Sequence, residues 1–244
     1  MAQTVDAPVA PTPEKSSLLE DFIDIFVTPS KVFERRATSG FFLVLLIVTV
    51  LIGVIVVATR GPMQGIVDAE VERQVAMVMQ QNPSLTGEQA QGMRGVMEMS
   101  ITYGVIVFIP IIILLLGLTT WLVGKLFGAR FSFTAGAMIA AYAYTPRILE
   151  SVLVAVQGLT LDTATMRGRF QLSFGVGRFL DPDTTSIGLL GVLGRVDLIT
   201  IWITILVGIG ISVVGKVPRS QGMMAAALIW LLGALPAVWQ LATG

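Results

Sequence analysis

The 244-residue sequence contains no cysteine and no histidine. Without cysteine there are no disulfides, no thiolate nucleophiles, and no cysteine-held zinc or iron–sulfur clusters. Without histidine there is no serine–histidine triad, no haem held by an imidazole, and no HExxH zinc site. Charged residues are also scarce, at 13% of the chain, against about 25% in an average soluble domain. These absences exclude most of the enzyme classes that a sequence motif could reveal.

Apolar residues dominate what is present. They make up 54% of the chain, and the mean hydropathy is +0.81. A soluble fold cannot bury that much apolar surface, so we predict an integral membrane protein with the lipid bilayer as its first partner. Sixteen basic residues balance sixteen acidic ones, which gives no indication of a nucleic-acid partner.

A nucleotide partner is not indicated either. The chain has no Walker sequence, and the glycine pair of residues 175–177 lacks the flanking strand and helix of a dinucleotide site. We therefore predict no nucleotide, no cofactor, no metal and no catalytic residues.

Five apolar segments are long enough to cross a bilayer. The first, 41–58, holds 18 uncharged residues, roughly 27 Å as a helix. The other four are 101–124, 135–156, 196–215 and 222–241. Prolines inside such spans are tolerated, because neighbouring helices can satisfy the freed carbonyl groups. We predict an all-α membrane protein, in which a five-helix bundle occupies residues 41–241.

The basic residues predict the orientation. Those on one side of the predicted bundle lie in short loops or beside the membrane, whereas the arginines on the other side are spread over two long loops. The near-membrane set comprises Lys31, Arg35, Arg36, Lys125, Arg130, Lys216 and Arg219. The positive-inside rule then predicts a cytoplasmic N-terminus and an extracytoplasmic C-terminus.

The segment before the first span predicts two short helices. Residues 1–15 form a proline- and alanine-rich lead, which we interpret as a disordered cytoplasmic tail. Residues 16–37 follow as an amphipathic interfacial helix pair. Ser17 and Glu20 have the spacing of a capping box at the start of the first helix, and Pro29 ends it and begins the second.

The first of these helices has an apolar and an acidic side. Glu20, Asp21 and Asp24 lie opposite its apolar row, so an anionic membrane surface would repel the acidic side. The apolar row must be covered by a protein partner, by lipid, or by the protein's own bundle, and the sequence leaves these alternatives open. The candidate partner-docking residues are Leu18, Phe22, Phe26, Pro29 and Phe33.

The long loop 59–100 has the pattern of an extracytoplasmic helical hairpin. Its second helix opens at Thr86, with Gln89 completing a capping box, and runs on into the second span. Five methionines of this loop suggest a Cu(I) site, but without histidine or cysteine beside them we interpret them as packing residues. They are Met77, Met79, Met93, Met97 and Met99.

The second long loop, 157–195, has an alternating pattern. Phe170, Leu172, Phe174 and Val176 alternate with polar residues, which is typical of a strand. Residues 159–163 could form its antiparallel partner. We therefore predict a small extracytoplasmic β-hairpin.

Three charged residues lie within or at the edge of the predicted spans. Arg147 and Glu150 share one turn of the third span, and Asp197 opens the fourth in the same half of the bilayer. An intramembrane charge costs about 2.5–3.5 kcal/mol on insertion scales, so such residues face a partner or a wet cavity. We favour a structural clamp in which Arg147 pairs with both carboxylates. The alternative is a cation, proton or substrate site.

Three stretches together carry a family resemblance. They are DFIDIFVTPSKVFERR (residues 21–36), AYAYTPRIL (141–149) and RVDLITIWITILVGIGI (195–211). They resemble the Yip family, the Ypt/Rab-interacting membrane proteins, in its prokaryotic form. The positions that carry the likeness are Tyr144, Pro146, Asp197 and Trp202. The DLYGP-type motif of eukaryotic members is absent, so the resemblance does not extend to Rab binding.

The resemblance implies a prokaryotic cytoplasmic-membrane protein without catalytic residues. We therefore predict a non-enzymatic integral membrane adaptor or scaffold of membrane organisation or transport-complex assembly, partnered by other membrane proteins or by further copies of itself. The alternative is a small-solute or ion transporter, channel or transporter accessory subunit that uses Arg147, Glu150 and Asp197.

Overall fold

The computed structural model describes residues 17–243, which form ten α-helices and three short 3₁₀ helices. The predicted tail, residues 1–15, lies outside the described part. Four helical segments are long and apolar enough to cross a membrane. They are α5 (Gly87–Leu126), α6 with α7 (Phe133–Ala143 and Pro146–Thr160), α9 (Leu198–Gly215) and α10 (Arg219–Thr243). A further apolar helix, α3 (Phe42–Ala58), has 17 residues, roughly 25 Å.

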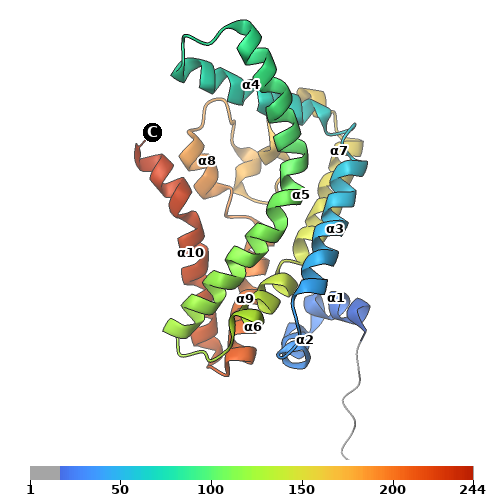
Figure 1. The fold of residues 1–244 in the computed structure, drawn as a ribbon, viewed down its shortest axis with the longest axis vertical. Helices are drawn as coiled ribbons and strands as arrows, with labels where there is room; N and C mark the ends of the chain where they lie inside the picture. Colours follow the sequence, from blue (N-terminus) through green and yellow to red (C-terminus); the bar gives the residue numbers. More distant parts are fainter. Residues whose placement is uncertain (1–16, 244) are drawn as a thin grey trace, which may run out of the picture.

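The long helices run along the long axis of the molecule and pack side by side (Figure 1). Helices α1 (Leu18–Val27) and α2 (Pro29–Arg36) lie across one end of this bundle, which we call the α1 end. At the opposite end, the α4 end, lie α4 (Gln64–Gln81), α8 (Ile187–Leu193) and the end of α10. The prediction of an all-helical membrane protein is confirmed.

The third predicted span, 135–156, consists of two helices. Helix α6 ends at Ala143, and Pro146 begins α7 after a break at Tyr144 and Thr145. Proline has no backbone N–H and clashes with the preceding turn, so a helix is interrupted there. The break separates the wholly buried residues of α6, from Ala135 to Ala143, from the more exposed α7.

Helix α6 is buried because its side chains are small enough for close packing. Six of its eleven residues are glycine or alanine. At the crossing with α5, a Cβ atom added to Gly117 would lie 2.7 Å from the Cα atom of Ala137. The two backbones therefore touch, as is usual where small residues face each other in membrane bundles.

The predicted helix pair at the N-terminus is confirmed. The Ser17 hydroxyl accepts a hydrogen bond from the Glu20 backbone N–H, and the Glu20 carboxylate accepts one from the Ser17 N–H. The first helix ends at Val27, and Pro29 occupies the first turn of α2.

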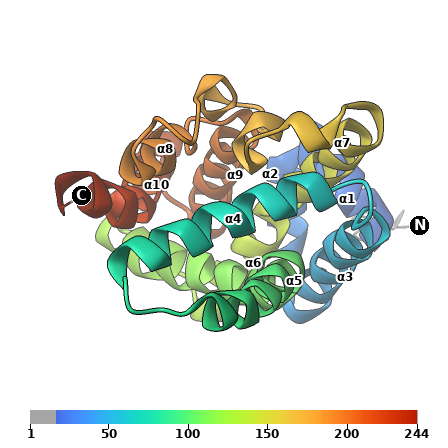
Figure 2. The ribbon, with the colours of Figure 1, turned by 90° about the horizontal axis from the view of Figure 1, so that it is seen from above.

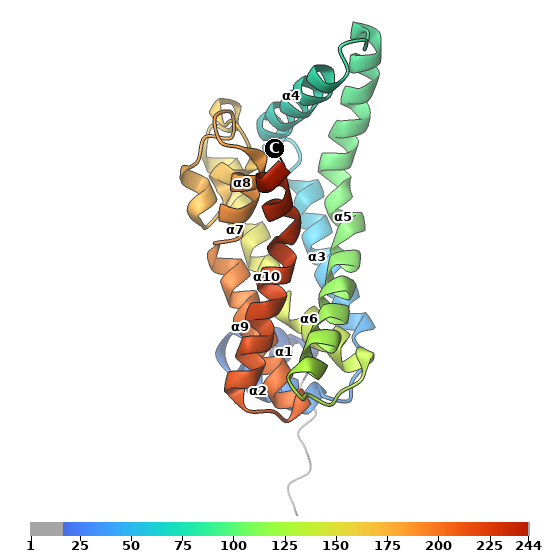
Figure 3. The same cartoon turned by 90° about the vertical axis from the view of Figure 1, so that its left-hand side faces the viewer.

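The predicted helical hairpin in the loop 59–100 is also confirmed as a helix pair. The capping box of Thr86 and Gln89 forms, and α5 then continues without interruption for 40 residues, roughly 60 Å. Its first part rises beyond the rest of the bundle (Figure 3), while α4 runs back across the α4 end (Figure 2).

The predicted β-hairpin is wrong. Within residues 17–243 no strand forms, and the segment holds 3₁₀ helices at Thr163–Thr165, Arg169–Leu172 and Val176–Phe179. Helix α7 continues through Thr160, so the expected first strand starts inside a helix. One isolated antiparallel bridge joins Gly175 to Asp197.

Candidate functional site

A buried carboxylate joins the N-terminal helices to the bundle. The Asp21 side chain is fully buried, and its Oδ1 atom lies 2.5 Å from Nη2 of Arg35. Its Oδ2 atom lies 2.6 Å from Nε of Arg36 and accepts a hydrogen bond of 2.9 Å from the Tyr142 hydroxyl of α6. We call these four residues the N-terminal clamp. It links the adjacent helices α1 and α2 to α6, which lies about a hundred residues further along the chain.

The contacts of Arg35 offset the cost of burying part of its charge. Burial alone would lower the pKa of this guanidinium group, but the hydrogen bonds to Asp24 and Asp21 outweigh it and raise the pKa above its usual value.

From the sequence, Asp21 was placed on the acidic side of α1 without a partner, whereas the structure buries it in a cluster of charges. The counter-charges come from Arg35 and Arg36, one helix further along the chain. The two adjacent arginines, 14 and 15 residues after Asp21, were a signal in the sequence from which this ion pairing could have been predicted. No pattern in the sequence pointed to Tyr142.

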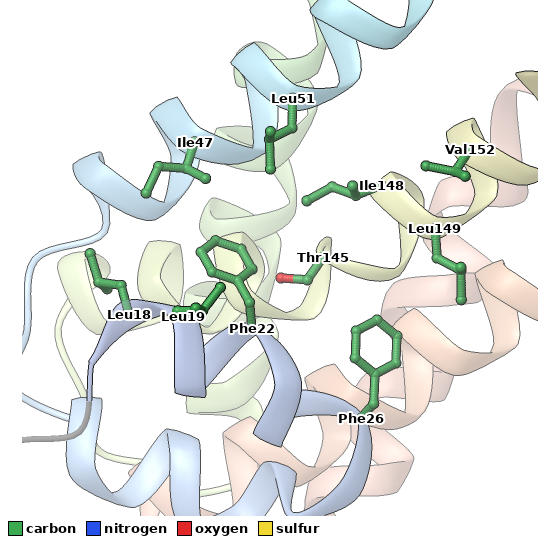
Figure 4. A pocket seen from close by; sticks show the side chains of 10 residues that line it. All are labelled: Leu18, Leu19, Phe22, Phe26, Ile47, Leu51, Thr145, Ile148, Leu149 and Val152. Atoms are coloured by element: carbon green, nitrogen blue, oxygen red, sulfur yellow. The ribbon is translucent and has the colours of Figure 1, made fainter.

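The candidate docking residues lie on the protein's own bundle. Leu18, Phe22 and Phe26 are partly buried and line an apolar cavity of about 580 Å³ (Figure 4). Ile47 of α3 and Ile148 of α7 lie across this cavity. Of the three alternatives for covering the apolar row, the structure therefore supports packing against the bundle. The docking of a protein partner by these residues stays a prediction.

The two remaining candidate docking residues contribute to the fold. Phe33 is fully buried in the core, and Pro29 begins α2. The exposed apolar residues of α1 are Leu19, Ile23 and Val27, spaced four residues apart on its outer side. This row suits the interfacial position that the sequence predicted for the helix.

The intramembrane charges are brought together in part. Arg147 pairs with Glu150, with 2.5 Å between Nη1 and Oε2, and its Nη2 donates a hydrogen bond of 2.9 Å to the Thr200 hydroxyl. Among the described residues, Arg147 has no ion pair with Asp197. The two are joined through Thr200, whose Oγ1 lies 3.4 Å from Oδ1 of Asp197.

Asp197 itself is the N-cap of α9. Its Oδ1 accepts hydrogen bonds from the backbone N–H groups of Ile199 and Thr200, at 2.9 and 3.0 Å. Its Oδ2 accepts one of 3.1 Å from the N–H of Phe174. The carboxylate thus stabilises the positive end of α9 and holds the outer loop against it.

A second arginine beside this cluster was not singled out from the sequence. Arg195 donates a hydrogen bond of 3.0 Å from Nη2 to the backbone carbonyl of Trp230, and its guanidinium lies 5.6 Å from the centre of that indole ring. Arg147 and Arg195 both line a cavity of about 470 Å³ among α5, α9 and α10. The sequence analysis counted Arg195 as an ordinary loop residue, although it stands only two positions before the N-cap.

The four positions of the family resemblance occupy structural joints. Tyr144 and Pro146 form the break between α6 and α7, and Asp197 caps α9. Trp202 packs against the core from the first turns of α9.

Long apolar helices that are able to cross a bilayer identify this chain as a multi-pass helical membrane protein. Comparison with family models matches residues 23–240 to the Yip1 domain. The chain therefore belongs to the Yip1 domain family, whose members are generally non-enzymatic proteins of membrane trafficking. Comparison with curated proteins and with solved structures gave no match.

Proposed function

We propose that the chain is a non-enzymatic membrane adaptor or scaffold, whose partner-binding surface is the arm formed by α4 and the first part of α5. The observation that carries this proposal is the exposure of the arm. Among residues 81–100, Ala90 is the single buried residue, yet residues 87–100 form one continuous stretch of helix. A continuous helix that projects from the bundle and buries little of itself is suited to contact another protein.

The arm is held in a fixed direction. Its two helices are joined by an ion pair of 3.2 Å between Arg94 and Glu72, and its base by one of 3.6 Å between Arg60 and Glu98. Two large apolar side chains, Val96 and Met99, lie three positions apart and are about two-thirds exposed. Exposed apolar side chains of this kind are enriched where proteins meet.

The proposal includes the orientation in the membrane. We infer that the α1 end faces the cytoplasm of a prokaryotic cell, because short basic loops lie there, and that the arm is extracytoplasmic. We also infer that α3 crosses the bilayer, which gives five spans. The partner is then another membrane protein, or a second copy, that exposes a surface outside the cytoplasm.

The test compares complexes in mild detergent. The full chain, extracted from its own membranes, should migrate as a complex larger than one chain. The double variant Val96→Gln with Met99→Gln should migrate as the single chain while keeping its melting temperature. The matched control is Phe179→Gln, which changes an even more exposed apolar residue outside the arm. The proposal is wrong if the wild type migrates alone, or if the double variant stays in the complex.

Transport of a small solute or ion is the second candidate function. The Arg147–Glu150 pair beside a cavity favours it. Against it, buried polar side chains in the described part are few and do not form a path towards the α1 end, where α6 fills the bundle. They are Asp21, Thr102, Thr120, Thr145 and Asp197. A transporter predicts that Glu150→Gln abolishes cellular activity while the complex still forms.

A further inference from the structure

We propose that the cavity among α5, α9 and α10 binds the phosphate group of an anionic membrane lipid, with Arg147 and Arg195 as the phosphate ligands. We call this space the arginine cavity. It holds about 470 Å³, and α6 and α7 close it at the break between them. The inference is independent of the arm, because no residue of the arm lines the cavity.

Three buried hydrogen-bond donors of the cavity wall have no partner among residues 17–243. They are Nε of Arg147, Nε of Arg195 and the indole N–H of Trp230. A buried donor left unpaired costs about 1–3 kcal/mol, and such groups are rare in folded proteins. All three are N–H groups, and none is an acceptor. The missing partner must therefore supply acceptor oxygens.

The charges also favour an anion. In the described part of the chain, Arg195 has no carboxylate within 4 Å, and it contacts a neutral carbonyl and an indole ring. Burial lowers the pKa of Arg195, and repulsion from Arg147 lowers it further. The nearby carboxylates are engaged elsewhere, Glu150 by Arg147 and Asp197 by the N-terminus of α9. A bound phosphate would neutralise this uncompensated charge and accept forked hydrogen bonds from guanidinium groups.

The walls of the cavity identify the rest of the ligand. Apart from the arginines, Trp230, Gly233 and a few hydroxyl-bearing side chains, they are aliphatic residues of α5, α9 and α10. Three of them, Ile112, Leu115 and Leu232, are 44%, 55% and 39% exposed, so the cavity opens on the side of the bundle that faces acyl chains. A soluble anion would not meet this route, whereas a lipid can enter from the bilayer with its chains along the aliphatic wall.

The test measures lipid retention by native mass spectrometry of the full chain in detergent, with either phosphatidylglycerol or diacylglycerol added; diacylglycerol has the same acyl chains but no phosphate group. The wild type should retain phosphatidylglycerol about tenfold better, the ratio that one hydrogen bond to a charged group supplies. Arg195→Gln should abolish this preference. Arg178→Gln, which removes the same charge from an exposed loop position, should keep it. Equal retention of the two lipids by the wild type, or equal losses in the two variants, overturns the proposal.

A second pair of variants covers the case in which Arg195→Gln fails to fold. Leu115→Trp narrows the cavity mouth, whereas Leu122→Trp changes an exposed residue two helical turns further along α5, outside the cavity. The first should lose bound phosphatidylglycerol and the second should not. Inorganic phosphate is then added as a competitor. If it displaces phosphatidylglycerol completely, the site is one for a free anion and the lipid assignment is wrong.

Discussion

The carboxylate of Asp21 joins the first two helices to α6, which is distant from them along the chain. It is fully buried and accepts from two guanidinium groups and one phenol. A buried charge is tolerated only where its partners replace the lost water, and here Arg35, Arg36 and Tyr142 do so. The clamp therefore fixes the α1–α2 pair to α6, and its stability should depend on this single side chain.

We expect Asp21→Asn to lower the free energy of unfolding by about 3 kcal/mol, because it leaves two arginines without their buried counter-charge. The measurement is thermal unfolding of the purified protein in detergent. Asp24→Asn is the control, since Asp24 also pairs with Arg35 but is about one-third exposed, and it should cost at most about 1 kcal/mol. Equal losses of unfolding free energy in the two variants would show that the burial of Asp21 does not strengthen its contribution to stability.

Asp197 has two possible roles, as the N-cap of α9 and as a counter-charge to Arg147, and two substitutions can distinguish them. As a cap it can be replaced by asparagine, so Asp197→Asn should cost about 1 kcal/mol, mainly through the bond to Phe174. Asp197→Ala loses the cap as well and should cost about 2–3 kcal/mol. Thermal unfolding of both variants decides the matter. If the two variants lose the same stability, the negative charge of Asp197 rather than its capping hydrogen bonds stabilises the fold, and Asp197 acts as a counter-charge to Arg147.

At the scale of the element, the crossing of α5 and α6 depends on the absence of a side chain at one position. A Cβ atom at Gly117 would meet the backbone of Ala137, which cannot move without displacing α6. At Gly104, on the same helix, a Cβ atom would lie 3.6 Å from the Phe108 ring, an ordinary contact.

Alanine substitutions at these two glycines should therefore change the melting temperature in opposite directions. Gly117→Ala should lower the melting temperature, because overpacking costs about 1–3 kcal/mol. Gly104→Ala should raise it or leave it unchanged, because alanine in a helix gains about 0.4–1 kcal/mol over glycine. Both are measured in the same detergent. A loss of stability at Gly104 equal to that at Gly117 would show that helix packing does not set the difference.

The elements that the sequence predicts well are those determined locally. The capping boxes at Ser17 and Thr86 and the boundary at Pro29 depend on neighbours within four residues, and all three form as expected. The failures are long-range. The alternation around Phe170 looked like a strand, but a strand needs a partner, and residues 159–160 belong to α7.

The contacts of the candidate site are likewise of two kinds: local ones, which the sequence predicts, and long-range ones, which it does not. Arg147 and Glu150 lie three positions apart on one helix, so their pairing was predictable from spacing. The contacts of Arg195 with Trp230, and of Asp21 with Tyr142, join residues 35 and 121 positions apart. No local pattern carries such contacts, because they depend on how the whole bundle folds.

At the scale of the whole molecule, the two ends differ in chemistry. The three lysines of the described residues all lie at the α1 end: Lys31 in α2, Lys125 in the last turn of α5 and Lys216 at the end of α9. The α4 end carries the arm and the long loop before α9, with arginines paired to carboxylates. The lysines thus gather at one end of the bundle, and the positive-inside rule predicts that this α1 end faces the cytoplasm.

The absence of cysteine makes this orientation directly measurable, because a single introduced cysteine is the only reactive thiol. Ser30→Cys and Ser220→Cys lie at the α1 end, and Ser84→Cys lies at the tip of the arm. In intact cells, a membrane-impermeant maleimide should label Ser84→Cys alone, and the other two only after permeabilisation. Labelling of Ser84→Cys and Ser30→Cys from the same side would mean that α3 does not cross the bilayer, leaving four spans. The reverse pattern at all three positions would leave the bundle intact but turn it over, with the arm in the cytoplasm.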